Sequence, residues 1–117
     1  MKLLVLILNK TSYLEDILHK FNSIGIKGAT VLDSMGVGRT MAYHHSTSSF
    51  ALMHSLRRAI DGGRPYNKTI ISVIDESLVD PAFKGVEEVL GDLHKPGVGI
   101  MFTVPIDGVA GLPKSYY

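Results

Sequence analysis

The residues from Lys2 to Leu8 form an almost unbroken aliphatic run near the start of the chain. A run of this length fits a β-strand and is far too short to cross a membrane. Because neither side of such a strand is polar, it belongs at the centre of a sheet that is covered on both faces. Asn9 and Lys10 end the run, and no small-residue cleavage site follows as in a signal peptide. We therefore expect a buried strand in a cytoplasmic protein with no direct membrane insertion.

A helix and a second strand follow this run. The helix is indicated by an apolar stripe at helical spacing, made of Leu14, Ile17, Leu18 and Phe21. Ser12 and Glu15 have the spacing of a capping box at its start, and Gly25 is well placed to end it. Residues 29–33 then favour a strand, so the first part of the chain reads as β-α-β.

Residues 34–66 show neither the apolar spacing of a helix nor that of a strand over their whole length. They contain several glycines and a run of polar residues, and they are far longer than a normal hairpin connection. Excursions of this kind are usually functional. Within this one, an apolar side made of Phe50, Met53, Leu56 and Ile60 favours a short helix.

The second part of the chain repeats the order of the first. Residues 67–74 are rich in Ile and Val, which favours a third strand. Asp80 as N-cap, followed by Pro81 at the first helical position, fits the start of a second helix, and Gly85 would weaken that helix by up to about 1 kcal/mol relative to alanine. Residues 94–99 indicate a turn, and residues 100–105 a fourth strand.

The order β-α-β, long loop, β-α-β predicts an α+β, ferredoxin-like split βαβ fold over residues 1–117, as a single domain. Its antiparallel sheet would carry both helices on one face. A chain of 117 residues has no third layer to cover the other face, so oligomerisation is expected.

Composition excludes several classes of function. The chain has no Cys, so disulfides, thiolate metal sites and cysteine nucleophiles are excluded. The net charge is only +1, and the nearest approach to a basic stripe is Arg57 and Arg58 with Arg64, so we expect no nucleic-acid partner. No nucleophile motif stands out, and helix capping and solvent exposure explain the acidic pairs at residues 75–76 and 87–88. We therefore expect a protein that is not an enzyme.

Three stretches together resemble the PII family of nitrogen regulatory proteins and their PII-like relatives. They are the opening strand and helix, then residues 25–31 leading to Gly36-Val37-Gly38-Arg39, and finally residues 97–105. The resemblance covers nearly the whole chain apart from the inside of the long loop at about 34–66, which corresponds to the family's T-loop. It implies a homotrimer with inward-facing sheets and a role in signal transduction. Family members bind ATP or ADP between subunits and dock through the T-loop onto enzymes, transporters or transcription factors.

This resemblance gives the candidate effector-binding residues, which are Gly36, Gly38, Arg39, Gly97 and Gly99. Loop amides and a guanidinium are also suited to an anion, although a flexible exit from the second strand and a plain tight turn explain the same residues. The first hypothesis for the effector is an adenine nucleotide (ATP, ADP or AMP), with no cofactor required.

The sequence departs from the family pattern at Thr40, Val98 and Ile100, and it lacks the arginine pair that follows the family's last strand. These lost cations leave a different small anion open as the effector. Whether nitrogen status or 2-oxoglutarate is sensed is left open as well.

Candidate partner-binding residues are Phe50, Met53 and Arg57 in the long loop. A helix there would dock onto a protein partner, or it would fold back over its own trimer. Two further functions stay open. One is a divalent-metal-binding trimer resembling CutA that uses His44 and His45, although exposed loop histidines explain this pair more simply and no metal ligand is assigned. The other is an interaction module that needs no small ligand.

Overall fold

The computed structural model describes residues 1–37 and 66–113. Four strands and two helices form this part of the chain, and a short 3₁₀ turn precedes each helix. The strands are β1 (Lys2–Leu8), β2 (Thr30–Met35), β3 (Tyr66–Ile74) and β4 (Gly99–Pro105), and the helices are α1 (Leu14–Ser23) and α4 (Val79–Leu90).

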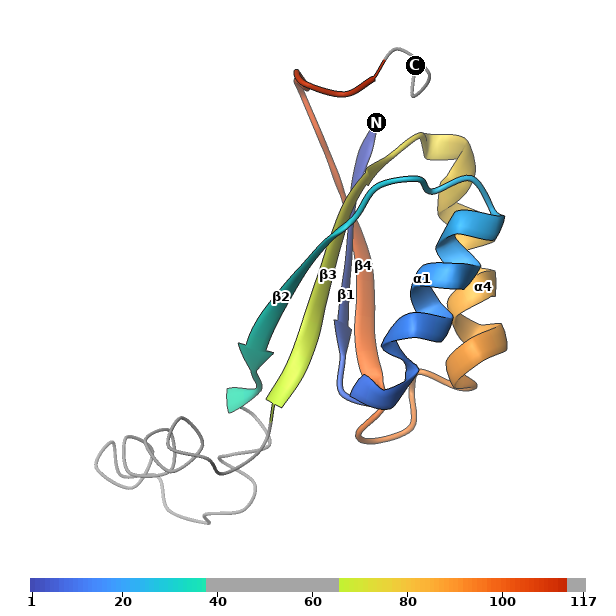
Figure 1. The fold of residues 1–117 in the computed structure, drawn as a ribbon, viewed down its shortest axis with the longest axis vertical. Coiled ribbons are helices and arrows are strands. Elements are labelled where there is room, and N and C mark those ends of the chain that lie inside the picture. Colours follow the sequence, from blue (N-terminus) through green and yellow to red (C-terminus); the bar gives the residue numbers. More distant parts are fainter. Residues whose placement is uncertain (38–65, 114–117) are drawn as a thin grey trace, which may run out of the picture.

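The four strands form one open antiparallel sheet in the order β2-β3-β1-β4. Both helices lie side by side on one face of this sheet (Figure 1). This arrangement confirms the predicted α+β, ferredoxin-like fold. It also places β1 at the centre, where its two neighbours are both strands from the second half of the chain.

The helix-covered face of the sheet holds the core. On this face Leu6 lies opposite Ile70 of β3 and Met101 of β4. Alternate residues of β1 are fully buried, as expected for a strand with one face packed. The core consists of Leu4, Leu6, Leu8, Ile17, Phe21, Ile26, Ile70, Ile74, Ala82, Val86, Leu90 and Val98.

The opposite face of the sheet is apolar too, but the single chain leaves it open. Its residues alternate with the core residues, so that Val5 lies between Ile71 and Phe102. Along β4, the side chains of Ile100, Phe102 and Val104 are 60%, 41% and 41% exposed. The aliphatic run of β1 is therefore packed on one side by the chain itself and only half-buried on the other.

Both helix starts differ from the sequence-based expectation. Ser12 lies inside a 3₁₀ turn, and α1 begins at Leu14 after Tyr13 without a side-chain cap, so the capping box is absent. Asp80 is not an N-cap either, because α4 already begins at Val79. The cap lies further upstream, where the side chain of Asp75 accepts a hydrogen bond from the Ser77 amide at the start of a 3₁₀ turn. A 3₁₀ turn precedes both helices, but only the turn before α4 begins with a side-chain cap.

The end of α1 follows the expected chemistry. Gly25 has φ of +100°, a conformation that side chains disfavour. The amide of Gly25 donates to the Asn22 carbonyl at 3.2 Å, and the amide of Ile26 donates to the Phe21 carbonyl at 2.9 Å. These two bonds form a Schellman motif. The motif turns the chain so that Ile26 enters the core.

No helix in the described ranges is both long enough and apolar enough to span a membrane.

Candidate functional site

A groove of about 380 Å³ is hollowed in the open face of the sheet, where β2 ends and β3 begins. We call it the loop-base groove, because the long loop leaves the sheet at this end (Figure 1). Its lining comes from all four strands and the residues just beyond them: Ile7, Asn9, Ser34, Met35, Gly36, Val37, Asn67, Thr69 and Ile100. The groove therefore joins the start of the long loop to the start of β4.

A hydrogen-bonded polar network lies within this lining. Its centre is the side chain of Asn67, which is only 4% exposed. The Asn67 Nδ2 donates to Asn9 Oδ1 at 3.2 Å, and its Oδ1 accepts a hydrogen bond from the Ser34 hydroxyl. The Ser34 Oγ also lies 2.7 Å from Thr69 Oγ1. A buried carboxamide is thus bonded at both of its ends, as buried polar groups require.

The direction of the network follows from the number of protons. The Ser34 hydroxyl has one proton, and it is directed at Asn67 Oδ1. The Thr69 hydroxyl must therefore donate to Ser34 Oγ. Hydrogen bonds then run in one direction from Thr69 through Ser34 and Asn67 to Asn9.

Asn9 continues the connection through its backbone. Its amide donates to the carbonyl of Val98 at 3.1 Å, in the turn before β4. Val98 is itself 2% exposed, so its side chain is fixed in the core while its carbonyl faces the end of β1. The turn that precedes β4 is therefore linked to the base of the long loop by hydrogen bonds that pass through the covalent frame of Asn9.

The predicted effector-binding residues are only partly brought together. Gly36 lines the loop-base groove, and a Cβ there would lie 3.4 Å from Asn67 Nδ2. Gly97 lies in the turn before β4, and Gly99 is the first residue of β4, directly before the lining residue Ile100. Gly38 and Arg39 lie outside the described residues, as do Phe50, Met53, Arg57, His44 and His45.

Gly97 in the turn and Gly99 at the start of β4 both have backbone reasons to be glycine. Gly97 has φ of +79°, and a Cβ there would meet no atom within 4 Å. Gly99 packs against the neighbouring strand, where a Cβ would lie only 2.6 Å from the Ile7 carbonyl oxygen. The turn is therefore shaped by its fit against β1 as well as by any ligand that it contacts.

The lining of the loop-base groove, as far as the structure describes it, contains no charged side chain. Its polar groups are two carboxamides and two hydroxyls, set among the apolar side chains of Ile7, Val37 and Ile100. Such a lining suits the uncharged part of a ligand through apolar contact and hydrogen bonding. An anionic part needs a cation that this lining, as far as it is described, does not supply.

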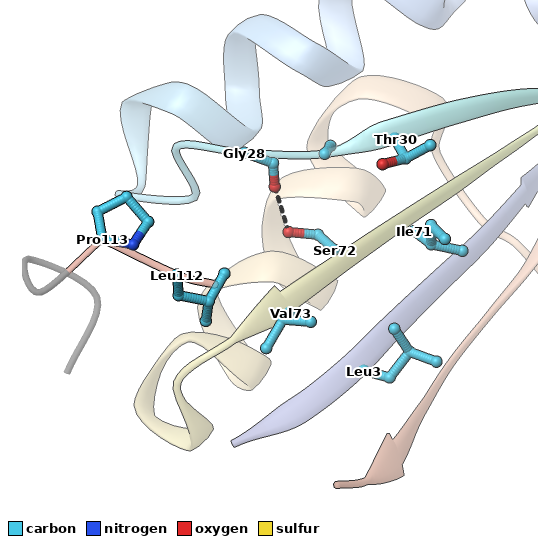
Figure 2. Close-up of a pocket in the computed structure, with 9 residues that line it drawn as sticks. Leu3, Gly28, Thr30, Ile71, Ser72, Val73, Leu112 and Pro113 are labelled. Atoms are coloured by element: carbon cyan, nitrogen blue, oxygen red, sulfur yellow. Dashed lines mark hydrogen bonds between the residues drawn. The ribbon is translucent and has the colours of Figure 1, made fainter. Parts of the chain in front are cut away.

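A second groove lies at the far end of the same open face (Figure 2). Its volume is about 350 Å³ and its lining is mostly apolar. Leu112 and Pro113 lie beside Val73 and Gly28 there, so the segment after β4 forms one wall (Figure 2). The Ser72 hydroxyl donates to the carbonyl of Gly28 and is 5% exposed as a residue, so the main polar group at this groove already has a partner.

Ionised groups with a shifted pKa lie away from both grooves. The hydroxyl and then the amide of Ser77 hold the pKa of Asp75 below its usual value. A hydrogen bond from Lys20 to Glu88, 2.9 Å long, lowers the pKa of Glu88 in the same way. Both carboxylates are solvent-exposed. Across residues 1–37 and 66–113 no three His, Cys, Asp or Glu side chains cluster as metal ligands.

The network residues were not predicted from the sequence. Ser34 comes from β2, Asn67 and Thr69 come from β3, and Asn9 follows the end of β1, so the bonded pairs are separated by as many as 58 residues. In the sequence, Asn9 marks only the end of an aliphatic run. The one local signal for the network is an Asn near the start of a strand. That Asn67 is buried there becomes clear only once the strand register is known.

Comparison with known families gives one result for the chain as a whole. The model of the family described as nitrogen regulatory protein P-II matches residues 1–114. A search of the curated proteins found no match of significance.

Proposed function

The chain belongs to the nitrogen regulatory protein P-II family, whose members are regulatory proteins, and from this we propose that it binds a small effector at the loop-base groove and controls a protein partner in response. An adenine nucleotide is the effector that we propose to test first. The long loop is the proposed contact with the partner, through Phe50, Met53 and Arg57.

The observation that carries this proposal is the convergence of two distant segments at one groove. Gly36 and Val37 come from the start of the long loop, and Ile100 comes from the strand that follows the Gly97–Gly99 turn. These are the segments that the family resemblance associates with the effector. A ligand in the groove would contact both, so it would affect how the long loop leaves the sheet.

The chemistry of the groove supports a nucleotide that uses two kinds of contact. The uncharged lining, with its carboxamides and hydroxyls, fits a base or a ribose. Phosphates would need the guanidinium of Arg39, because arginine binds phosphate oxygens through paired hydrogen bonds.

We propose that the working form is a homotrimer in which the open sheet faces of three chains cover one another. The apolar strip formed by Val5, Ile71 and Phe102 supports this, since an exposed apolar sheet face of this kind usually marks an interaction surface. The loop-base groove opens on the same face, so neighbouring chains would complete its walls.

The experiment that tests the effector is calorimetric titration of the full chain with ATP, ADP, AMP and cyclic AMP, each with and without magnesium. Two variants test the location, Gly36→Ala in the groove and Arg39→Ala in the loop. Gly36 lies outside the positive-φ region, and among residues 1–37 and 66–113 the nearest contact of the added methyl is the Asn67 amide at 3.4 Å, so the fold should tolerate it. Gly108→Ala is the matched control, because Gly108 also lacks a positive φ and a Cβ there meets nothing.

We expect saturable binding that weakens about tenfold or more in each of the two variants, a loss of about 1.4 kcal/mol, and stays unchanged in Gly108→Ala. Binding that neither Gly36→Ala nor Arg39→Ala alters would place the nucleotide elsewhere on the chain. No heat with any nucleotide at millimolar concentration would reject a nucleotide effector.

A further inference from the structure

The polar network of the loop-base groove connects two parts of the chain that the fold keeps apart. Ser34 and Asn67 lie on β2 and β3, at the two ends of the long loop. Asn9 lies after β1, and Val98 lies in the turn before β4. Hydrogen bonds join these four residues in sequence, from Ser34 to Asn67, from Asn67 to Asn9, and from the Asn9 amide to the Val98 carbonyl.

We propose that this series couples the base of the long loop to the glycine turn before β4, with Asn67 as the positioning residue. A shift of β2 and β3 at the loop base is then transmitted to the turn, and a shift of the turn is transmitted back to the loop base. The coupling is reciprocal, because a single coupling free energy between the loop base and the turn acts equally in both directions. The inference rests on the proposed function only for the ligand that would use this coupling.

The choice of residue at position 67 supports a role beyond filling space. A leucine has nearly the same shape and would be buried at this site without the cost of desolvating an amide. The carboxamide is favourable here only while Ser34 and Asn9 satisfy it, because an unpaired buried polar group costs about 1–3 kcal/mol. The network is therefore stable when complete and unfavourable when one bond is missing, so it resists displacement at either end.

Position in the sheet explains how the effect would cross from one edge to the other. Ser34 pairs with Asn67 in the register of β2 and β3, so both side chains lie on the open face. In the described part of the chain, Asn67 forms side-chain hydrogen bonds to both β2 and the residue after β1. Backbone pairing alone would hold the strands together, and the side-chain bonds add a connection between the loop base and Asn9.

Amide hydrogen exchange in the full chain without ligand tests the proposal. The reporter is the Asn9 amide, which donates to the Val98 carbonyl. Neither of the two network variants below changes residue 9. Ser34→Ala removes the far end of the network, and Asn67→Leu removes its centre. Ser72→Ala is the matched control, because Ser72 lies on the same strand and loses a hydrogen bond to Gly28 that is not part of the network.

We expect the Asn9 amide to exchange about fivefold faster or more in Ser34→Ala, and about tenfold faster or more in Asn67→Leu, each corrected for global stability. In Ser72→Ala the rate should stay within about threefold of wild type, as for an uncoupled site. A rescue variant, Asn9→Asp, keeps an oxygen that accepts from Asn67 Nδ2, so its residue-9 amide should stay protected while that of Asn9→Leu should not.

An Asn9 amide that is unchanged by Ser34→Ala and Asn67→Leu, or equally affected by Ser72→Ala, would overturn the coupling. If Asn67→Leu does not fold, Ser34→Ala decides alone, because it leaves the buried carboxamide in place. No nucleotide is present in this experiment. A failed nucleotide titration would therefore reject the proposed effector and leave the coupling result unaffected.

Discussion

The side chain of Lys20 lies directly across Gly85, where α1 and α4 pack together. A Cβ added to Gly85 would lie only 2.8 Å from Lys20 Cγ, and the Lys20 ammonium reaches Glu88 at 2.9 Å, one turn further along α4. Gly85 is buried within the helix. The glycine thus gives space to the stem of a lysine whose charged end is paired.

This contact predicts that the effect of Gly85→Ala changes sign with the residue at position 20. In the wild type, the methyl displaces Lys20, so the free energy of unfolding falls by about 1 kcal/mol despite the better helix propensity of alanine. In a Lys20→Ala background the space is free, and the same change should raise stability by up to about 1 kcal/mol. Urea unfolding of the four proteins measures both values. An effect of the same sign in both backgrounds would contradict this account.

Gly99 and Gly97 should differ in their tolerance of alanine. At Gly99 the methyl would meet the Ile7 carbonyl oxygen at 2.6 Å, and that oxygen belongs to the central strand, so we expect a loss of about 2–3 kcal/mol. At Gly97 the methyl meets nothing, and only the positive φ costs about 1 kcal/mol. Urea unfolding of the two variants gives the order. Equal losses would show that the close approach to β1 does not decide the residue at position 99.

Ser77→Ala should raise the pKa of Asp75. The hydroxyl is the larger of the two Ser77 contributions, and the amide of residue 77 still donates, so the pKa should return only part of the way to its usual value. A carbon-detected NMR titration of the carboxyl group measures it. Ser23→Ala is the control, since the Ser23 hydroxyl bonds only to the Lys20 carbonyl among the bonds described for it. A pKa of Asp75 that does not move would contradict the assigned cause.

The sign of the associated pH dependence follows from the lowered pKa. A carboxyl whose pKa is lower in the folded state stabilises the fold above its unfolded pKa, about 4, and loses that contribution as the pH falls through its folded value. The stability difference between wild type and Ser77→Ala should therefore shrink below about pH 4. Because Asp75 is exposed, the difference should be small at every pH.

Phe102→Asp should dissociate the proposed trimer without unfolding the chain. Phe102 is 41% exposed on the open sheet face, so it contributes little to the core, while a carboxylate between packed sheets would be desolvated. Light scattering after gel filtration should show a fall from the mass of three chains to that of one. Lys84→Asp on the exposed side of α4 is the control and should leave the mass unchanged. A wild-type chain that is already monomeric would reject the trimer.

The sequence pattern predicts the elements of this fold well, because the apolar periods of β1, α1 and α4 are determined by the packing of one layer on another. It predicts local details less well. The spacing of Ser12 and Glu15 fits a capping box, yet Ser12 lies in a 3₁₀ turn while Glu15 lies in the first turn of α1. A single-helix motif does not account for such a turn. Gly85 reads as a weak point of its helix until the position of Lys20 across from it is known.

The candidate site was harder to predict than the fold. Gly36 lines the groove, and its role in effector binding stays a prediction, but the residues that give the groove its polar character come from separate parts of the chain. Whether Asn67 faces Ser34 or the core depends on a register shift of one residue, which reverses every side chain of a strand. Local composition contains no information about that choice.

The order of the strands has a consequence for the way the chain is made. β1 and β2 do not pair with each other, and each requires β3 as a neighbour. A nascent chain that has exposed β1, α1 and β2 but not β3 has no partner for either strand. Sheet formation must wait until β3 emerges, and β1 is not flanked on both sides until β4 follows. We therefore expect the nascent chain to be most vulnerable to aggregation and to need chaperones during that interval, because unpaired strands expose apolar surface and free edges.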